Sequence, residues 1–186
     1  MKLGSLVAIS IALAATTTAD ARPRPHSLTA GAKRFEANKT FGLGIELGEP
    51  TSINGKWFVG RDQALDFGIG TIYHYRDRSG LNLYADYLWH PLVLTSAEAF
   101  ELPLYVGIGG RYWDFDYGCD RNGNNCLLNA SGIGVRVPVG ISFDFNNVPL
   151  DIFIQLVPTL DFYRDYNEHD VYLDVNFSLG IRYWFS

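Results

Sequence analysis

The chain has 186 residues and a formal net charge of -5, a length that fits one domain. Apart from a short run near the N-terminus, no segment approaches the roughly 18 consecutive apolar residues that a membrane-spanning helix needs, so any place in a membrane requires strands. The mild acidity and the lack of a basic, aromatic-rich surface argue against a nucleic acid as partner.

The first 21 residues have the features of a cleaved secretory signal peptide. Lys2 supplies a positive start, an apolar stretch follows from Leu6 to Ala15, and Ala19-Asp20-Ala21 offers the small-x-small pattern that signal peptidase recognises. We therefore expect cleavage after Ala21. The alternative, an apolar helix of the mature protein, is the weaker interpretation because the stretch is too short to span a bilayer.

Residues 22–38 differ in character from everything that follows. They are basic, contain Pro23 and Pro25, and lack hydrophobic periodicity. This composition predicts a flexible tail. The folded domain is therefore expected to span residues 39–186.

From residue 40 onward, long segments alternate between apolar and polar residues, as side chains on the two faces of a β-strand do. The last segment alternates without a break and is long enough for a tilted membrane crossing, which needs roughly 9–11 residues. Short clusters of turn-forming residues separate the segments. Eight strands are predicted, at Thr40–Gly48, Thr51–Phe58, Ala64–Tyr75, Leu81–His90, Leu102–Phe115, Ala130–Phe145, Leu150–Tyr163 and Val171–Phe185.

Two local irregularities are expected within this pattern. Pro91–Glu101 is predicted to be a longer connection, in which Thr95–Glu98 forms one helical turn. Pro138 and Pro158 lie inside predicted strands, where each removes a hydrogen-bond donor from the ladder, so we expect β-bulges at both.

An even number of two-faced strands joined by short turns predicts an all-β fold, a closed antiparallel up-and-down barrel. A soluble lipocalin-type barrel places its apolar face inside, whereas a transmembrane barrel places it outside. The transmembrane form is favoured because the apolar face gains aromatic residues towards the strand ends, as interfacial girdles do. These are Trp57, Tyr73, Tyr75, Tyr87, Trp89, Tyr112, Phe143, Phe145, Phe162, Tyr183 and Phe185.

The C-terminal residues carry a resemblance to a known class of proteins. Ser178-Leu179-Gly180-Ile181-Arg182-Tyr183-Trp184-Phe185 resembles the assembly signal of bacterial outer-membrane barrels, with Ser178, Gly180, Tyr183 and Phe185 as its pattern and Ser186 trailing the expected terminal aromatic. The chain from about residue 40 onward resembles the small eight-stranded OmpA and OmpX type of Gram-negative bacteria.

This resemblance implies a cellular address. It places the protein in the outer membrane, among lipid and lipopolysaccharide, and implies insertion by the barrel-assembly machinery. With an even strand number, both termini lie in the periplasm, where the basic tail can meet acidic material. The resemblance is one of architecture, so it says little about activity.

Charged residues on the polar face are expected to fill the interior. An eight-stranded barrel is only wide enough for side chains, and buried charges must be paired. We therefore expect a salt-bridged plug; a narrow gated ion path is the alternative. The predicted network consists of Glu46, Lys56, Asp66, Asp86, Arg111, Arg136, Asp144, Asp151, Asp161, Asp174 and Arg182.

The two cysteines, Cys119 and Cys126, lie close together in a polar loop. In an exported protein such a pair predicts a disulfide that stiffens the loop, and metal binding without a nearby histidine is the weaker interpretation. Residues 120–125 vaguely resemble a calcium loop but lack its terminal glutamate and properly placed glycine, so turn formation explains them better. No metal site and no cofactor are expected.

Catalysis on this scaffold needs a serine, a histidine and an acid close together. Asp86 and His90 share one strand face, and His74 also points inward, but no serine is spaced to join them. We therefore expect a monomeric barrel with a structural or surface-interaction role, the latter through its outward loops. A small gated channel and a lipid-modifying enzyme are the alternatives.

Overall fold

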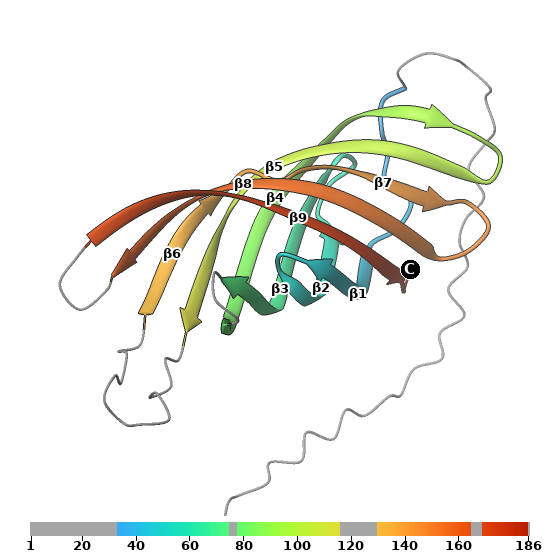
Figure 1. The fold of residues 1–186 in the computed structure, drawn as a ribbon. Coiled ribbons are helices and arrows are strands. Elements are labelled where there is room, and N and C mark those ends of the chain that lie inside the picture. The colour runs from blue at the N-terminus through green and yellow to red at the C-terminus, as the bar shows by residue number, and fades with distance from the viewer. Residues whose placement is uncertain (1–32, 75–77, 116–129, 165–168, 186) are drawn as a thin grey trace, which may run out of the picture.

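A computed structural model describes residues 33–74, 78–115, 130–164 and 169–185 as one antiparallel sheet (Figure 1). Cys119, Cys126 and the predicted signal peptide lie outside the described residues. Within them, no helix is long and apolar enough to cross a membrane. The strands are β1 (Phe41–Gly48), β2 (Thr51–Phe58), β3 (Gln63–His74), β4 (Arg78–Ser96), β5 (Phe100–Phe115), β6 (Ala130–Arg136), β7 (Val139–Phe145), β8 (Leu150–Arg164) and β9 (His169–Trp184).

The sheet closes on itself. Apart from β6 and β7, strands that are neighbours in sequence pair with each other, and the ring is completed where β1 pairs with β9, as in the pair Ile45–Ile181. β6 and β7 occupy one place in the ring, since both pair with β5 on one side and β8 on the other. The predicted eight-stranded antiparallel barrel is therefore confirmed.

The break between β6 and β7 has a simple chemical cause. Pro138 accepts a hydrogen bond from the Gly107 N–H at 2.8 Å, and Pro158 accepts one from the Val137 N–H at 2.9 Å, but neither proline can donate the reciprocal bond. The pairing register is the same on both sides of each proline. The predicted bulges at these two positions are therefore wrong: the prolines remove donors without adding a residue.

The irregularities of register lie elsewhere, in the pairing of β4 with β5. They fall at residues 89–92 and 93–95, so the proline that the ladder accommodates with a bulge is Pro91. The predicted connection Pro91–Glu101, with its helical turn, is wrong. β4 continues through the proline to Ser96, and only residues 97–99 link it to β5. Figure 1 shows the resulting long hairpin at the right of the barrel.

The two faces of the barrel differ sharply in chemistry. Along β9, Val171, Phe177 and other outward apolar residues are exposed, while inward-facing Asn176 and Arg182 are buried. The same alternation holds around the ring. Outward apolar positions include Leu43, Ile45, Ile53, Phe67, Ile69, Leu83, Ile108, Ile133, Val135, Leu156, Leu160 and Leu179.

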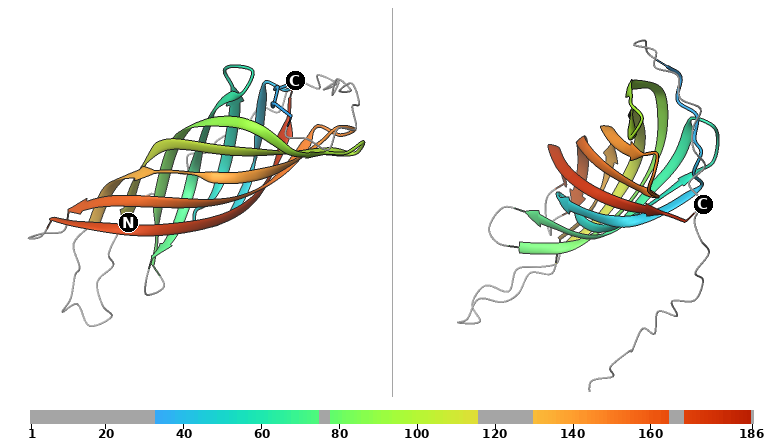
Figure 2. Two further views of the ribbon diagram at one scale, coloured as in Figure 1. Left: turned by 90° about the horizontal axis from the view of Figure 1, so that it is seen from above. Right: turned by 90° about the vertical axis from the view of Figure 1, so that its right-hand side faces the viewer.

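The described residues ahead of β1 are packed against the barrel. Phe35 is buried, Lys33 forms a β-bridge with Val93, and the Ala37 N–H donates to the Arg61 carbonyl at 2.7 Å. The predicted flexible tail is therefore wrong for residues 33–38; its earlier part lies outside the described residues. Figure 2 shows this blue segment at the end of the barrel where the C-terminus lies.

Candidate functional site

The interior of the barrel holds the charged residues that the strand pattern places on its inward face. Of the predicted set, only Asp174 is partly exposed. The others are buried: Glu46, Lys56, Asp66, Asp86, Arg111, Arg136, Asp144, Asp151, Asp161 and Arg182. Alternation along the strands brings them to one interior because successive side chains point to opposite faces.

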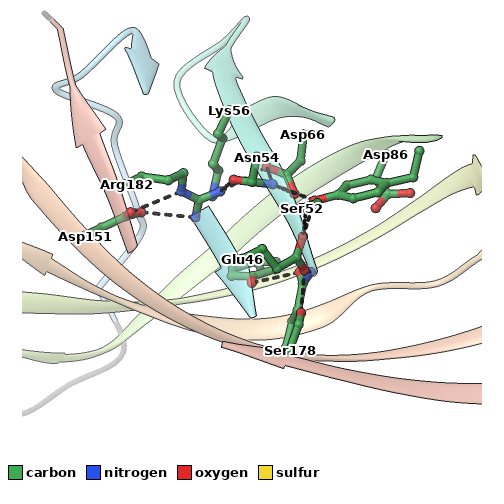
Figure 3. Close-up of polar contacts among 12 residues, drawn as sticks. Glu46, Ser52, Asn54, Lys56, Asp66, Asp86, Asp151, Ser178 and Arg182 are labelled. Carbon is green, nitrogen blue, oxygen red and sulfur yellow. Dashed lines mark hydrogen bonds and ion pairs between the residues drawn. The ribbon is translucent and has the colours of Figure 1, made fainter. Parts of the chain in front are cut away.

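One cluster is organised by Arg182 (Figure 3). Its guanidinium binds Asp151 through two hydrogen bonds of 3.1 Å each, donates to Asp66 at 2.9 Å and to the Asn54 amide oxygen at 3.1 Å. It also lies 4.0 Å from the centre of the Phe153 ring. A planar guanidinium suits such bidentate pairing, so one cation holds side chains from three strands.

A second cluster surrounds Glu46, whose carboxylate is fully buried. Four neutral groups donate to it: Ser178 at 2.5 Å, Tyr84 at 2.5 Å, Gln155 at 2.7 Å and Ser52 at 2.8 Å. Figure 3 shows Ser52 and Ser178 converging on it from different strands. The carboxylate is thus satisfied by hydrogen bonds, the condition under which a buried charge is tolerated.

A third cluster, nearer the end of β9 that begins at His169, centres on Arg111. Its guanidinium pairs with Asp161 through Nε at 2.8 Å and through Nη2, and donates to Asn176 at 2.6 Å and to Asp174 at 3.3 Å. Trp113 donates to Asp161 at 3.3 Å. Three clusters spaced along the bore therefore cross-link its walls.

One part of the interior is less completely bonded. Arg136 pairs with Asp86 at 3.2 Å, and its guanidinium lies 3.9 Å from the centre of the Tyr84 ring. Yet Arg136 Nε and Nη1 and both polar atoms of the Asn82 side chain are buried and have no hydrogen-bond partner among the described residues. Buried polar atoms of this kind are rare in folded proteins, so this group of residues differs from the three clusters.

His90 and Asp86, two of the residues considered for catalysis, have separate partners in the interior. His90 Nδ1 donates to the Asp62 carbonyl at 3.1 Å, so its Nε2 accepts from Lys56 Nζ at 2.8 Å. Asp86 faces Arg136 rather than the histidine. The side chain of His74 lies outside the described residues. Among the described residues, no group of three metal-binding side chains occurs.

The predicted network consists of charged residues alone and leaves out the neutral members of the interior and one cation. The signal that finds the neutral members is their spacing, because each lies an even number of residues from a charged, inward-facing position on the same strand. These residues are Ser52, Asn54, Tyr84 and Gln155. Lys39 pairs with Asp144 but precedes the first strand, where no periodic signal exists.

The residues of the predicted assembly signal also have places in the barrel. Ser178 binds Glu46, and a side chain at Gly180 would overlap the ring of Phe153. Tyr183 and Phe185 are exposed on the outward face, with their rings 5.2 Å apart.

Comparisons with known proteins give a family and a structural likeness. A family model described as "Protein of unknown function (DUF3996)" matches residues 32–186. The comparison with curated proteins found no match. Among solved structures, the chain is similar to the N-terminal β-barrel domain of Pseudomonas aeruginosa OprF. The identity is 13%, the match covers 78% of this chain and 95% of that one, and the TM-score is 0.48.

Proposed function

The chain belongs to the DUF3996 family, and we propose that it is an integral outer-membrane barrel whose polar interior closes the bore, with a structural or surface-interaction role and no catalysis. The observation that carries this proposal is the inverted distribution of side chains, apolar outside and charged inside. A water-soluble barrel buries its apolar face, whereas hydrocarbon requires it outside.

The outward aromatic residues support the membrane setting. Trp57, Tyr183 and Phe185 are exposed at or next to strand ends, and the exposed Trp89 lies beside Gln63, where β3 begins. These residues lie at one rim of the apolar band, where aromatic side chains anchor a barrel at the membrane interface. The ring meets another requirement of hydrocarbon at the junction of its first and last strands, where residues 42–48 of β1 pair with residues 178–184 of β9.

The filled interior supports a barrel without a steady pore. Arg111 and Arg182 each tie several strands together across the bore, and opening a path means separating buried ion pairs, which costs several kcal/mol. Planar-bilayer recordings on the purified protein test this. We expect no stable large conductance, and steady channels of that kind would contradict the proposal.

A narrow gated path is the second candidate, favoured by the incompletely bonded group at Arg136, Asp86 and Asn82. Carboxylates outnumber cations in the predicted interior set, seven against four, so such a path would select cations. Small, brief, cation-selective currents that increase in Arg136→Leu, which removes a positive charge from the path, but stay unchanged in the exposed-site variant Arg34→Leu would favour it over the closed barrel.

The absence of catalysis is proposed because His90, the histidine whose side chain the structure describes, is engaged by Lys56 and a backbone carbonyl. A comparison of lipid A and phospholipid masses between cells with and without the protein tests this. Unchanged masses are expected, and a reproducible mass shift that depends on His90 would establish an enzyme.

The proposed assembly route uses the residues at the end of β9. Tyr183 and Phe185 face outward, where the assembly machinery can reach them, and we place both termini in the periplasm. The partners that follow are outer-membrane lipid, lipopolysaccharide and the assembly machinery, with the barrel itself monomeric. Tyr183→Ser combined with Phe185→Ser is expected to reduce the amount of folded protein in the membrane of cells but not its refolding into detergent.

A further inference from the structure

The segment of residues 33–40, called the strap here, runs across the end of the barrel where β1 begins and β9 ends, called the terminal mouth (Figure 2). The strap belongs to no strand of the ring. Its contacts nevertheless reach several different strands and turns of the barrel, which sets it apart from an ordinary lead-in to β1.

Phe35 is the apolar anchor of the strap. It is only 2% exposed, although the segment on either side of it, at Arg34 and Glu36, is exposed. Its ring centre lies 4.9 Å from that of His90 and 5.6 Å from that of Phe58. β2 and β4 thus supply a socket of ring-bearing side chains, and burial of the phenylalanine ring in this socket stabilises the docked strap.

Lys39 is the charged anchor and reaches the opposite part of the rim. Its ammonium pairs with Asp144 of β7 and donates to the Phe145 carbonyl at 3.2 Å. It also lies 5.8 Å from the centre of the Trp184 ring of β9. The lysine side chain is almost fully buried, so the strap contributes a cation to the polar interior.

Two backbone hydrogen bonds, made by strap residues beside the anchors, also join the strap to the rim. The Val93 N–H donates to the Lys33 carbonyl at 2.7 Å, and the Ala37 N–H donates to the Arg61 carbonyl at 2.7 Å. The Lys33 side chain lies 3.5 Å from Glu101. Together these bonds fix the strap to β4, β5 and the turn between β2 and β3.

The strap covers a pair of buried basic groups. Lys56 Nζ lies 2.8 Å from His90 and 4.7 Å from the centre of the Tyr105 ring. Phe58, which contacts the Phe35 ring, also packs against the small apolar cluster containing Ala64. Removing Phe35 therefore takes away the outermost layer above Lys56, His90 and this cluster.

The geometry points to a docking site for an extended peptide at the terminal mouth, occupied by the chain's own strap, which closes the barrel at that end. The two anchors, a phenylalanine and a lysine four residues apart, meet strands on different sides of the ring. This closure goes beyond the proposed function, because it depends on contacts at the mouth and not on the clusters along the bore. A segment held by two anchors and few backbone bonds can open without unfolding the barrel.

Amide hydrogen exchange on the full mature chain in detergent micelles tests whether the strap is docked. We expect the peptide covering residues 33–40 to be protected, and Phe35→Ala to raise its exchange rate at least about tenfold, while the matched exposed-site variant Arg34→Ala leaves it unchanged. Exchange of this peptide at the rate of an unstructured chain in the unmutated protein would overturn the inference.

A thiol reporter tests whether the strap closes the mouth. In a Cys119→Ser, Cys126→Ser background, Ala64→Cys places the single thiol at a position that is 0% exposed. We expect a charged maleimide to label it at least about tenfold faster after Phe35→Ala or Lys39→Ala than with the strap intact. Heat-modifiable gel mobility checks that each variant still forms the barrel. Equal labelling rates in folded variants with and without the anchors would refute closure.

Discussion

At the scale of single residues, the interior is governed by hydrogen-bond satisfaction rather than by charge pairing alone. Strand parity was enough to predict that Arg182, Asp66 and Asp151 point into the bore. It did not predict that Glu46 is held by four neutral donors, because pairing across the bore depends on side-chain length and barrel shear, which no local pattern encodes.

Removal of the Glu46 carboxylate tests this bonding. Glu46→Ala leaves the donors of Ser52, Tyr84, Gln155 and Ser178 without their acceptor, and buried unsatisfied groups cost about 1–3 kcal/mol each. We expect the free energy of unfolding in lipid vesicles, measured by urea titration with tryptophan fluorescence, to fall by about 3 kcal/mol or more. Glu98→Ala, at an exposed glutamate, serves as the control and is expected to change it by less than about 0.5 kcal/mol.

Gly180 provides a test of packing. A Cβ at this position would overlap the Phe153 ring and the Ile45 carbonyl oxygen, whereas at Gly110 the nearest atom lies 3.5 Å away. Gly180→Ala is expected to destabilise the barrel by about 1–3 kcal/mol, and Gly110→Ala to have little effect. Adding Phe153→Ala should lessen the penalty of Gly180→Ala. If Gly180→Ala reduces folding equally with and without Phe153→Ala, the result would point to recognition by the assembly machinery instead.

At the scale of elements, alternation predicted the strands well and their ends less well. It predicted β9 and the faces of every strand, since a half-buried strand repeats every two residues. It failed at Pro91, where a bulge lets β4 continue, and at Phe35 and Lys39, where two isolated side chains anchor a segment without any period. Such anchoring depends on the shape of the mouth, which exists only after the ring has closed.

An arginine placed on the outward face of β9 tests the proposal that this face meets hydrocarbon. Leu179→Arg, in the middle of the apolar face, is expected to cost about 2–4 kcal/mol in vesicles, while Val171→Arg, near the strand end, should cost less than about 1 kcal/mol. Both positions are exposed in the barrel. Urea titration in vesicles measures both, and small, equal costs at the two positions would show that this face does not meet hydrocarbon.

At the scale of the whole molecule, the arrangement of side chains explains both the proposed preference of the exterior for lipid and the proposed closure of the bore. The exterior is apolar, the bore is cross-linked by Arg111, Arg182 and Glu46, and the strap covers one end. The sequence alone predicted the first two features because they follow from alternation around a closed ring. It could not predict the third, because the strap follows no repeating pattern.

Quenching of single tryptophans by lipids with brominated acyl chains tests the central claim most directly. Trp57 and Trp89 are 48% and 40% exposed on the outward face, whereas Trp113 and Trp184 are 8% and 2% exposed on the inward face. In four variants that each retain one tryptophan, the others being replaced by phenylalanine, we predict strong quenching for Trp57 and Trp89 and little for Trp113 and Trp184. Stronger quenching of the inward pair, or no quenching of any of the four, would contradict the account.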